Sequence, residues 1–340
     1  MPDLRESPAT SVAAGAAGMT FVGGSVAVSS VLATAPLLTA QAVRYAAACL
    51  LLVAFARATG RKLVRPCGAE WLWLSGIAVT GLVVFNVALV QGSRHAEPAV
   101  LGVAVACVPA VLAVAGPLLE GSRPRPVVVA AALVVTGGAA LVQGLGRTDL
   151  AGLGWAAVAF GCEAGFTLLA VPVLGRHGPW GVSVHTTWIG AVIFAGLGLT
   201  AEGPAAVTRL RPPDWAAAGY LAVAVTAVAF VLWYSCVRRL GASRAGLLTG
   251  VAPAAAAVAG VLLGGPAPRP QVWAGIAVVA AGLALGLPGG RRRGGPWLVP
   301  RQSAEREGCP GRPAGTQPGR EAVSAPGAHR PARPASRISS

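Results

Sequence analysis

The stretch PAVLAVAGPLLEGSRPRPVVVAAALVVTGGAAL, residues 109–141, recurs without a gap as PAAAAVAGVLLGGPAPRPQVWAGIAVVAAGLAL, residues 253–285. The offset is 144 residues, and 19 of the 33 aligned positions are identical. Three prolines and one arginine fall in register, which a composition rich in small residues does not explain. Five apolar segments separate any point in one copy from its mate. In a membrane, the second copy would therefore be inverted, an arrangement found in many transporters.

The composition indicates a membrane protein. The chain is 54% hydrophobic and 11% charged, with a mean hydropathy of +0.65, whereas a soluble domain carries about a quarter charged residues. The charges are confined to short clusters between apolar runs of roughly 17–23 residues, the length that crosses ~30 Å of hydrocarbon. We therefore predict an all-α integral membrane protein.

Ten apolar runs predict ten transmembrane helices in two inverted five-helix repeats, 19–145 and 151–288. Pro36 sets the turn between the first two spans, because the residue before a proline disfavours helix. The predicted spans are 19–38, 40–56, 71–91, 98–119 and 126–143, followed by 152–174, 181–200, 215–237, 242–263 and 271–287.

Lys and Arg are divided unevenly between alternate loops. One set of loops carries five, and the other carries ten: Arg57, Arg61, Lys62, Arg65, Arg123, Arg125, Arg176, Arg238, Arg239 and Arg244. The richer loops usually face the cytoplasm. We therefore expect a multi-pass plasma-membrane protein with both termini in the cytoplasm.

Two tails flank the repeats, residues 1–18 and 289–340, and we expect both to be disordered. Much of the net charge of +15 lies in the second tail, whose Pro, Gly, Ser and Arg residues leave little to bury. Arg291, Arg292 and Arg293 are expected to lie against anionic lipid headgroups. The charge is therefore not taken as a sign of nucleic-acid binding.

The six cysteines and four histidines show no spacing typical of metal ligands, so we predict neither a metal site nor a cofactor. The scattered histidines and short loops argue against an enzyme. An enzyme acting on lipid-linked intermediates and a scaffold that transports nothing remain as alternatives, and a homodimer remains open.

Two series of motifs resemble the EamA domain of the drug/metabolite transporter (DMT) superfamily. The first consists of Gly81-Leu82, Asn86, Ala88-Leu89, Pro109, Gly116 through Glu120, and Gly137-Gly138. The second consists of Ala227 to Tyr234, Arg238 through Ala242, Ala245, Pro253, Gly260 through Gly264, and Gly282. The resemblance covers residues 19–287.

This resemblance implies a central substrate cavity surrounded by spans one to four and six to nine, with spans five and ten at the periphery. It also implies proton- or gradient-coupled movement of small metabolites, often efflux of amino acids. The chain departs from the family pattern at Gly264, where a glutamate like Glu120 is usual, and at Glu97, where a small residue is usual.

Glu163 is the leading candidate for a coupling residue, because it lies near the middle of span six without a Lys or Arg in that span. An ionisable residue at this depth usually faces a partner or a cavity. Thr167 lies one turn further on the same face. Burial favours the neutral form of a carboxyl group, and proton coupling needs a group that exchanges a proton. The alternative is a protonated glutamate that only packs against a neighbouring helix.

Other polar residues are candidates for the substrate cavity. Arg44 could bind a carboxylate or phosphate, or extend toward the membrane surface and orient its helix. Asn86 could bind substrate or bridge helices. His185 either takes part in coupling or is a neutral side chain bonded to a backbone carbonyl. Trp233 and Tyr234 are expected in the aromatic belt at the membrane surface.

Pro109 and Pro253 are mates in the middle of spans four and nine. Each removes one backbone hydrogen bond and bends its helix. We expect them to act as hinges, although bent packing alone would also account for them.

We therefore expect a secondary transporter that exports amino acids or related small metabolites by alternating access, with one repeat rocking against the other and protons as the coupling ion. An exporter of cationic drugs from the same superfamily is the main alternative.

Overall fold

The computed structural model describes residues 7–29, 32, 35–262, 264 and 267–287. These residues belong to one unit of the chain, Met1–Pro300. They are helical throughout, and within them the only β-type contact is an isolated bridge between Ala96 and Thr148. The tail 289–340, including the predicted lipid-binding arginines, lies outside the described residues.

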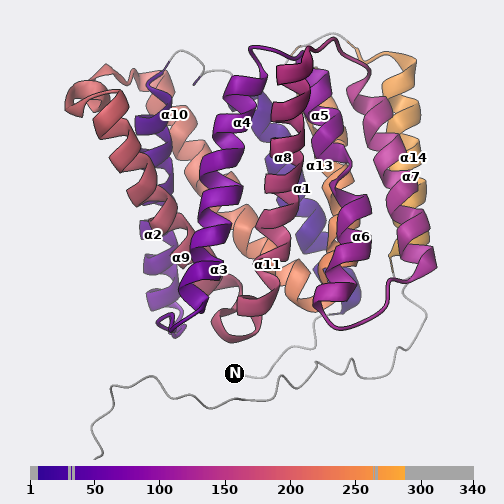
Figure 1. Ribbon diagram of the computed structural model, residues 1–340, viewed down its shortest axis with the longest axis horizontal. Helices are drawn as coiled ribbons and strands as arrows, with labels where there is room; N and C mark the ends of the chain where they lie inside the picture. The colour runs from indigo at the N-terminus through magenta and orange to yellow at the C-terminus, as the bar shows by residue number, and fades with distance from the viewer. Residues whose placement is uncertain (1–6, 30–31, 33–34, 263, 265–266, 288–340) are drawn as a thin grey trace, which may run out of the picture. The chain divides into compact units, whose positions relative to one another are not determined.

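The helices run alternately up and down between two ends of a bundle (Figure 1). The first repeat contains α1 Pro8–Ser29, α2 Leu37–Ala58, α3 Glu70–Ile77, η2 Ala78–Val84, α4 Phe85–Gly92, α5 Pro98–Ala106, α6 Val108–Leu119 and α7 Pro126–Gln143. The second contains α8 Leu150–Leu168, α9 Val171–Ala201, η3 Pro204–Arg209, α10 Pro212–Tyr220, η4 Leu221–Val228, α11 Ala229–Leu240, α12 Ala242–Leu247, η5 Leu248–Gly250, α13 Val251–Leu262 and α14 Pro270–Gly286.

The two ends of the bundle differ in charge. Loops 59–69 and 120–125 and the turns at Gly178 and Gly241 lie at one end, which we call the basic end because it holds the arginine-rich set of loops. Loops 93–97, 144–149 and 202–211 lie at the opposite end.

Length and hydropathy confirm only part of the ten transmembrane helices that we predicted. Within the described residues, eight helical stretches are long and apolar enough to cross a membrane, and α14 is a shorter apolar helix. The predicted turn is confirmed, since Pro36 is extended and α2 begins at Leu37.

The N-terminal prediction was wrong for residues 8–18, which we expected to be disordered and which form the first part of α1. The reason is close tertiary packing between small residues. A side chain at Gly15 would meet Cys236 and Leu248, and one at Gly18 would lie 3.3 Å from the carbonyl oxygen of Ala229. Glycine therefore lets α1 approach α11.

Both proline-bearing spans are interrupted close to the prolines. Span four is divided at Cys107, between α5 and α6, and Pro109 follows within the first turn of α6. Span nine is interrupted by the 3-10 turn η5, and Pro253 follows near the start of α13. Because proline lacks the N–H that would continue the helix, a break on its N-terminal side is the expected response.

The two repeats also share a feature that we did not predict. Spans three and eight each contain a π-helical stretch, η2 and η4, and the offset of 144 residues places Val84 on Val228 at their ends. π-Helical turns are uncommon and are frequent at functional sites. The offset therefore relates both the proline breaks and the π-helical stretches.

The repeats are interleaved in space. Two helices pack on their own inverted mates, α2 along α9 and α7 along α14, and α6 of span four packs on α12 of span nine. In addition, α1 packs on α11 and α13, while η2 and α4 pack on α8. Each repeat therefore draws its main helix contacts from the other.

The contact between α7 and α14 at one edge of the bundle depends on two glycines (Figure 1). A Cβ atom at Gly138 would lie 2.7 Å from the Val279 nitrogen, and one at Gly275 would lie 2.7 Å from the Gly138 oxygen. Small residues allow such close approach of helices within a membrane.

We expect Gly138→Val to separate α7 from α14 and to destabilise the protein by roughly 1–3 kcal/mol, the usual cost of overpacking. Gly137→Val is the matched control, because a side chain there would meet nothing within 4 Å. Thermal unfolding of the purified protein in detergent would measure both variants. Equal losses in the two would contradict this account of the helix contact.

Candidate functional site

The first polar cluster joins spans two, three and eight, and we call it the Arg44 cluster. It consists of Gln41, Arg44 and Tyr45 from α2, Asn86 from α4 and Thr226 from η4. Gln41 Nε2 donates to Asn86 Oδ1 at 2.8 Å. Arg44 Nε donates to Thr226 Oγ1 at 2.9 Å, and Arg44 Nη1 donates to Gln41 Oε1 at 3.3 Å.

Helix geometry explains how the cluster forms. Gln41, Arg44 and Tyr45 are three and four residues apart and share one face of α2. The guanidinium carbon of Arg44 lies 5.0 Å from the centre of the Tyr45 ring, a distance suited to a cation–π contact. Asn86 Nδ2 donates to the Leu82 carbonyl oxygen at 2.6 Å, which fixes the orientation of the amide. The sequence placed Arg44 and Asn86 on different spans, and Gln41 connects them.

Arg44 has no carboxylate partner among the described residues, and its hydrogen bonds there use Nε and Nη1 but not Nη2. A guanidinium group presents five N–H donors in a planar fork. Its positive charge and free donors are therefore available to an anionic group of a solute.

The second polar cluster lies on α8 and α11, and we call it the Glu163 cluster. It consists of Glu163, Phe166, Thr167, Trp233 and Tyr234. Trp233 Nε1 donates to Thr167 Oγ1 at 3.2 Å. Tyr234 Oη donates to the Phe166 carbonyl oxygen at 3.5 Å, and its ring lies 5.2 Å from that of Phe166. Glu163 lies close enough to Tyr234 for an electrostatic interaction.

Glu163 lies on the protein-facing side of α8. It shares that side with buried Ala156, Ala159 and Thr167, whereas Leu150 and Val158 on the other side are exposed. Its own side chain is partly exposed. The carboxylate thus faces the interior of the bundle at a place that is not closely covered.

Among the acidic residues that the structure describes, Glu163 alone makes no hydrogen bond and no ion pair. The others have partners: Glu70 pairs with Arg176, Glu97 with Arg147, Asp149 with His95, and Asp214 with Arg211, while Glu120 and Glu202 accept backbone hydrogen bonds. A carboxylate that stays ionised at membrane depth needs a partner. Glu163 therefore differs from every other acidic side chain in the described bundle.

One helix face connects the two clusters. Thr226, Phe230 and Tyr234 are four residues apart along η4 and α11 and so lie in a row. Thr226 accepts a hydrogen bond from Arg44, the Phe230 ring lies 5.0 Å from that of Phe166, and Tyr234 interacts electrostatically with Glu163. Span eight thus extends from the Arg44 cluster to the Glu163 cluster.

His185 belongs to neither cluster. Its Nε2 lies 2.9 Å from the carbonyl oxygen of Val64, which can only accept, and its Nδ1 accepts from Trp188 Nε1 at 3.2 Å. In a neutral His185 ring, Nε2–H therefore donates to Val64 and Nδ1 accepts from Trp188, so both ring nitrogens have a partner. Its neighbour His177 is buried, and the rings lie 5.4 Å apart. His177 Nε2 lies 3.1 Å from a Glu70 oxygen, at the basic end.

Gln41, Trp233 and Tyr234 belong to the two clusters but were not among the predicted site residues. Trp233 and Tyr234 were expected at the membrane surface, but they are 2% and 0% exposed. The sequence could have indicated the position of Tyr234, since Tyr234 follows Thr226 and Phe230 at four-residue spacing and therefore lies on the same helix face. Gln41 could have been predicted in the same way, because it lies three residues before Arg44 on the same helix face.

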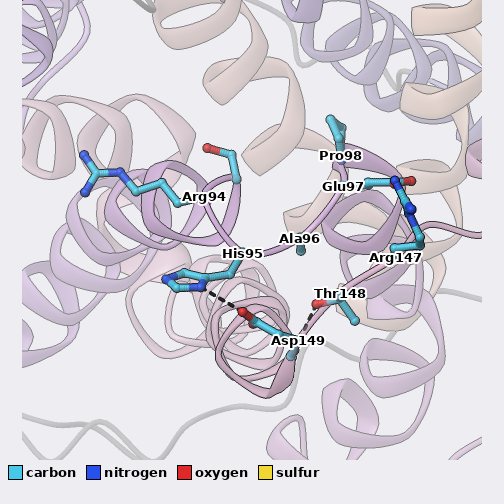
Figure 2. A pocket seen from close by; sticks show the side chains of 9 residues that line it. Arg94, His95, Ala96, Glu97, Pro98, Arg147, Thr148 and Asp149 are labelled. Atoms are coloured by element: carbon cyan, nitrogen blue, oxygen red, sulfur yellow. Dashed lines mark hydrogen bonds and ion pairs between the residues drawn. The ribbon is translucent and has the colours of Figure 1, made fainter.

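A pocket of about 490 Å³ lies at the opposite end, away from both clusters. It is lined by residues 93–98 and 147–149. Figure 2 shows His95 directed at Asp149 and Arg147 lying beside Glu97. The hydrogen bond from Arg147 holds the pKa of the Glu97 carboxyl below its ordinary value of 4.5. The charges of this pocket thus pair largely with one another and join loop 93–97 to loop 144–149.

No group of three or more His, Cys, Asp or Glu side chains in the described part of the chain is arranged to hold a metal ion.

Asp149 provides a pH test of the loop contact. Hydrogen bonds from the Gly152 N–H and then from His95 hold the pKa of Asp149 below its ordinary value of 3.8. A lowered pKa in the folded state stabilises the fold above the unfolded value, and the stabilisation is lost as the pH falls through the folded value. We expect hydrogen exchange at Gly152, corrected for its intrinsic pH dependence, to accelerate only below about pH 4.

Asp149→Asn is the control for this pH step, since an amide can still accept the Gly152 hydrogen bond but does not titrate. A step of the same size in Asp149→Asn would show that another group causes it.

Comparisons with known proteins agree with the two-repeat helical fold. Residues 10–143 and 150–287 match the sequence model of the EamA-like transporter family, once for each repeat. No curated protein matches the chain. One solved crystal structure, described only as that of a protein, matches with a TM-score of 0.69 at 19% sequence identity. The match covers 82% of this chain and 97% of that one, and at this identity it supports the fold alone. The chain belongs to the EamA-like transporter family and is a multi-pass membrane protein with the two-repeat fold of that family.

Proposed function

We propose that the protein is a secondary transporter that exports a small metabolite across the plasma membrane by alternating access, in exchange for protons. The observation that carries the proposal is Glu163, the acidic side chain without a hydrogen bond or ion pair in the described bundle. A carboxylate directed at the protein interior can take up a proton when water reaches it and release the proton when access changes. Proton antiport needs such a group.

The solute class follows from the Arg44 cluster. The unpaired guanidinium favours a solute with a carboxylate, and Gln41, Asn86 and Tyr45 offer further donors and acceptors at the same depth. An amino acid or a related zwitterion fits this arrangement, because its carboxylate can bind the Arg44 guanidinium.

The positions of the two clusters support alternating access. Arg44 lies in the half of α2 nearer the opposite end, and Glu163 lies in the half of α8 nearer the basic end. The row Thr226, Phe230 and Tyr234 joins them. A shift of span eight at its π-helical stretch would therefore change both sites together, and Pro109 and Pro253 would supply bending in spans four and nine.

The orientation follows from the positive-inside rule. We place the basic end and both termini in the cytoplasm, so Arg44 lies nearer the outer surface. The partners are then a small solute, protons, and lipid headgroups at the membrane surface, and a homodimer remains compatible with the fold.

An exporter of cationic compounds is the second candidate. The ring centres of Phe166, Phe230 and Tyr234 lie within 6.3 Å of one another, and Tyr234 interacts electrostatically with Glu163. Aromatic rings attract organic cations. In that case Glu163 would bind the solute directly, and Arg44 would have no role in binding.

The coupling role of Glu163 can be tested in proteoliposomes with an imposed pH gradient and a panel of amino acids and organic cations. We expect Glu163→Gln to abolish accumulation driven by the gradient while solute exchange at equal pH continues, because the amide cannot carry a proton. Glu97→Gln is the control, since Glu97 lies in an exposed loop outside the spans. Gradient-driven accumulation that survives in Glu163→Gln would exclude Glu163 as the coupling group.

The role of Arg44 can be tested with pairs of solutes that differ only in a carboxylate. We expect Arg44→Lys to weaken transport of the carboxylate form by roughly tenfold or more, the value of one or two charge-assisted hydrogen bonds, and to leave the corresponding amide unchanged. Arg94→Lys in the exposed loop serves as control. Equal effects on both solutes would favour the cationic alternative or a structural role.

A further inference from the structure

Two glutamates connect the repeats in opposite directions. Glu120, at the end of α6 in the first repeat, accepts a hydrogen bond from the backbone N–H of Ala242 in the second repeat at 3.0 Å. Glu202, at the end of α9 in the second repeat, accepts from the N–H groups of Leu38 and Thr39 in the first repeat, both at 2.9 Å, and from Thr39 Oγ1 at 2.7 Å. Each carboxylate thus caps a helix of the other repeat.

The capping is favourable for a simple electrostatic reason. The first N–H groups of a helix have no partner within it, and the N-terminus carries a partial positive charge. Gly241 allows the approach at α12, because its φ of 78° suits glycine. A Cβ there would also lie 3.1 Å from Glu120 Oε2.

The two contacts lie at opposite ends of the bundle. Glu120 binds at the basic end, where α6 packs on α12 and a Cβ at Gly116 would lie 3.0 Å from the Cβ of Ala242. Glu202 binds at the opposite end, where a Cβ at Gly198 would lie 3.1 Å from Thr39 Oγ1. These are the ends that must open in turn if a solute is to cross.

Spans four and nine pack against each other at the basic end but mainly against other helices nearer the opposite end. At the basic end α6 packs on α12, whereas nearer the opposite end α5 packs on α7 and α8, and α13 packs on α1 and α7. None of the described side chains of α13 is fully buried. The mate of Glu120 is Gly264, which has no side chain to cap the start of α5. A capping glutamate is thus present at one end of this helix pair and missing at the other.

We propose that Glu120 and Glu202 are positioning residues for the transport cycle. Glu120 holds spans four and nine together at the basic end, and Glu202 holds spans two and seven together at the opposite end. Loss of either carboxylate loosens only its own end of the bundle. This inference rests on the alternating-access transport proposed above, but it concerns residues that bind neither solute nor proton.

The test is hydrogen exchange of the full chain in lipid nanodiscs, without any solute. We expect Glu120→Ala to accelerate exchange at residues 242–245 by about tenfold or more, as loss of a charge-assisted hydrogen bond predicts, with no change at residues 38–40. Glu202→Ala should give the reverse pattern. Glu120→Gln and Glu202→Gln keep an acceptor oxygen and should give smaller changes at the same places, which also covers the case in which an alanine variant does not fold.

Glu97→Ala is the matched control, because Glu97 lies at the same end as Glu202 but pairs with the exposed side chain of Arg147. Glu97→Ala should change hydrogen exchange neither at residues 242–245 nor at residues 38–40. The proposal is overturned if either variant accelerates exchange at both ends equally, or if neither does. The end-specific pattern does not depend on Glu163, so failure of proton coupling in the flux experiment would leave it standing.

Discussion

Hydrocarbon supplies no hydrogen bonds, so each polar group within the membrane must find its partner inside the protein. The Arg44 cluster meets this demand by joining three spans through Gln41, Asn86 and Thr226. Glu120 and Glu202 meet it by capping helices of the other repeat. Two charged side chains inside the described spans differ from the rest of the polar network: the guanidinium of Arg44 has no carboxylate partner, and Glu163 has no hydrogen bond. Since burying a charge is costly, these two residues are where solute and proton are expected to bind.

The scaffold is symmetric, whereas the chemistry placed on it is not. The offset of 144 residues relates the proline breaks of spans four and nine and the π-helical stretches of spans three and eight. The same offset places Met19 opposite Glu163 and Gly264 opposite Glu120. Duplication therefore accounts for the matched breaks and π-helical stretches in the two repeats, and divergence after it accounts for the lack of an acidic mate for Glu163 and for Glu120.

The sequence predicted the features that depend on composition and local geometry: the helical membrane class, the turn at Pro36, and helix breaks beside Pro109 and Pro253. It failed where tertiary packing decides. Residues 8–18 looked unstructured because Ala and Gly are weakly apolar, yet Gly15 and Gly18 allow α1 to pack on α11. The position of Trp233 and Tyr234 near the end of span eight suggested an aromatic belt at the membrane surface. Both side chains instead pack against α8 and form hydrogen bonds with it. The interleaving of the repeats likewise depends on which helices pack together, and the hydropathy pattern does not predict that.

The central claim is that the carboxyl group of Glu163 changes its protonation state while the protein remains folded in the membrane. Infrared difference spectroscopy of the protein in lipid, recorded between acidic and alkaline buffer, measures this directly through the carbonyl band of a protonated carboxyl group. We expect the spectra of the protein and of Glu163→Gln to differ by one component of this band, which varies with pH and changes when a transported solute is added. Identical pH-dependent bands in the protein and in Glu163→Gln would contradict this claim.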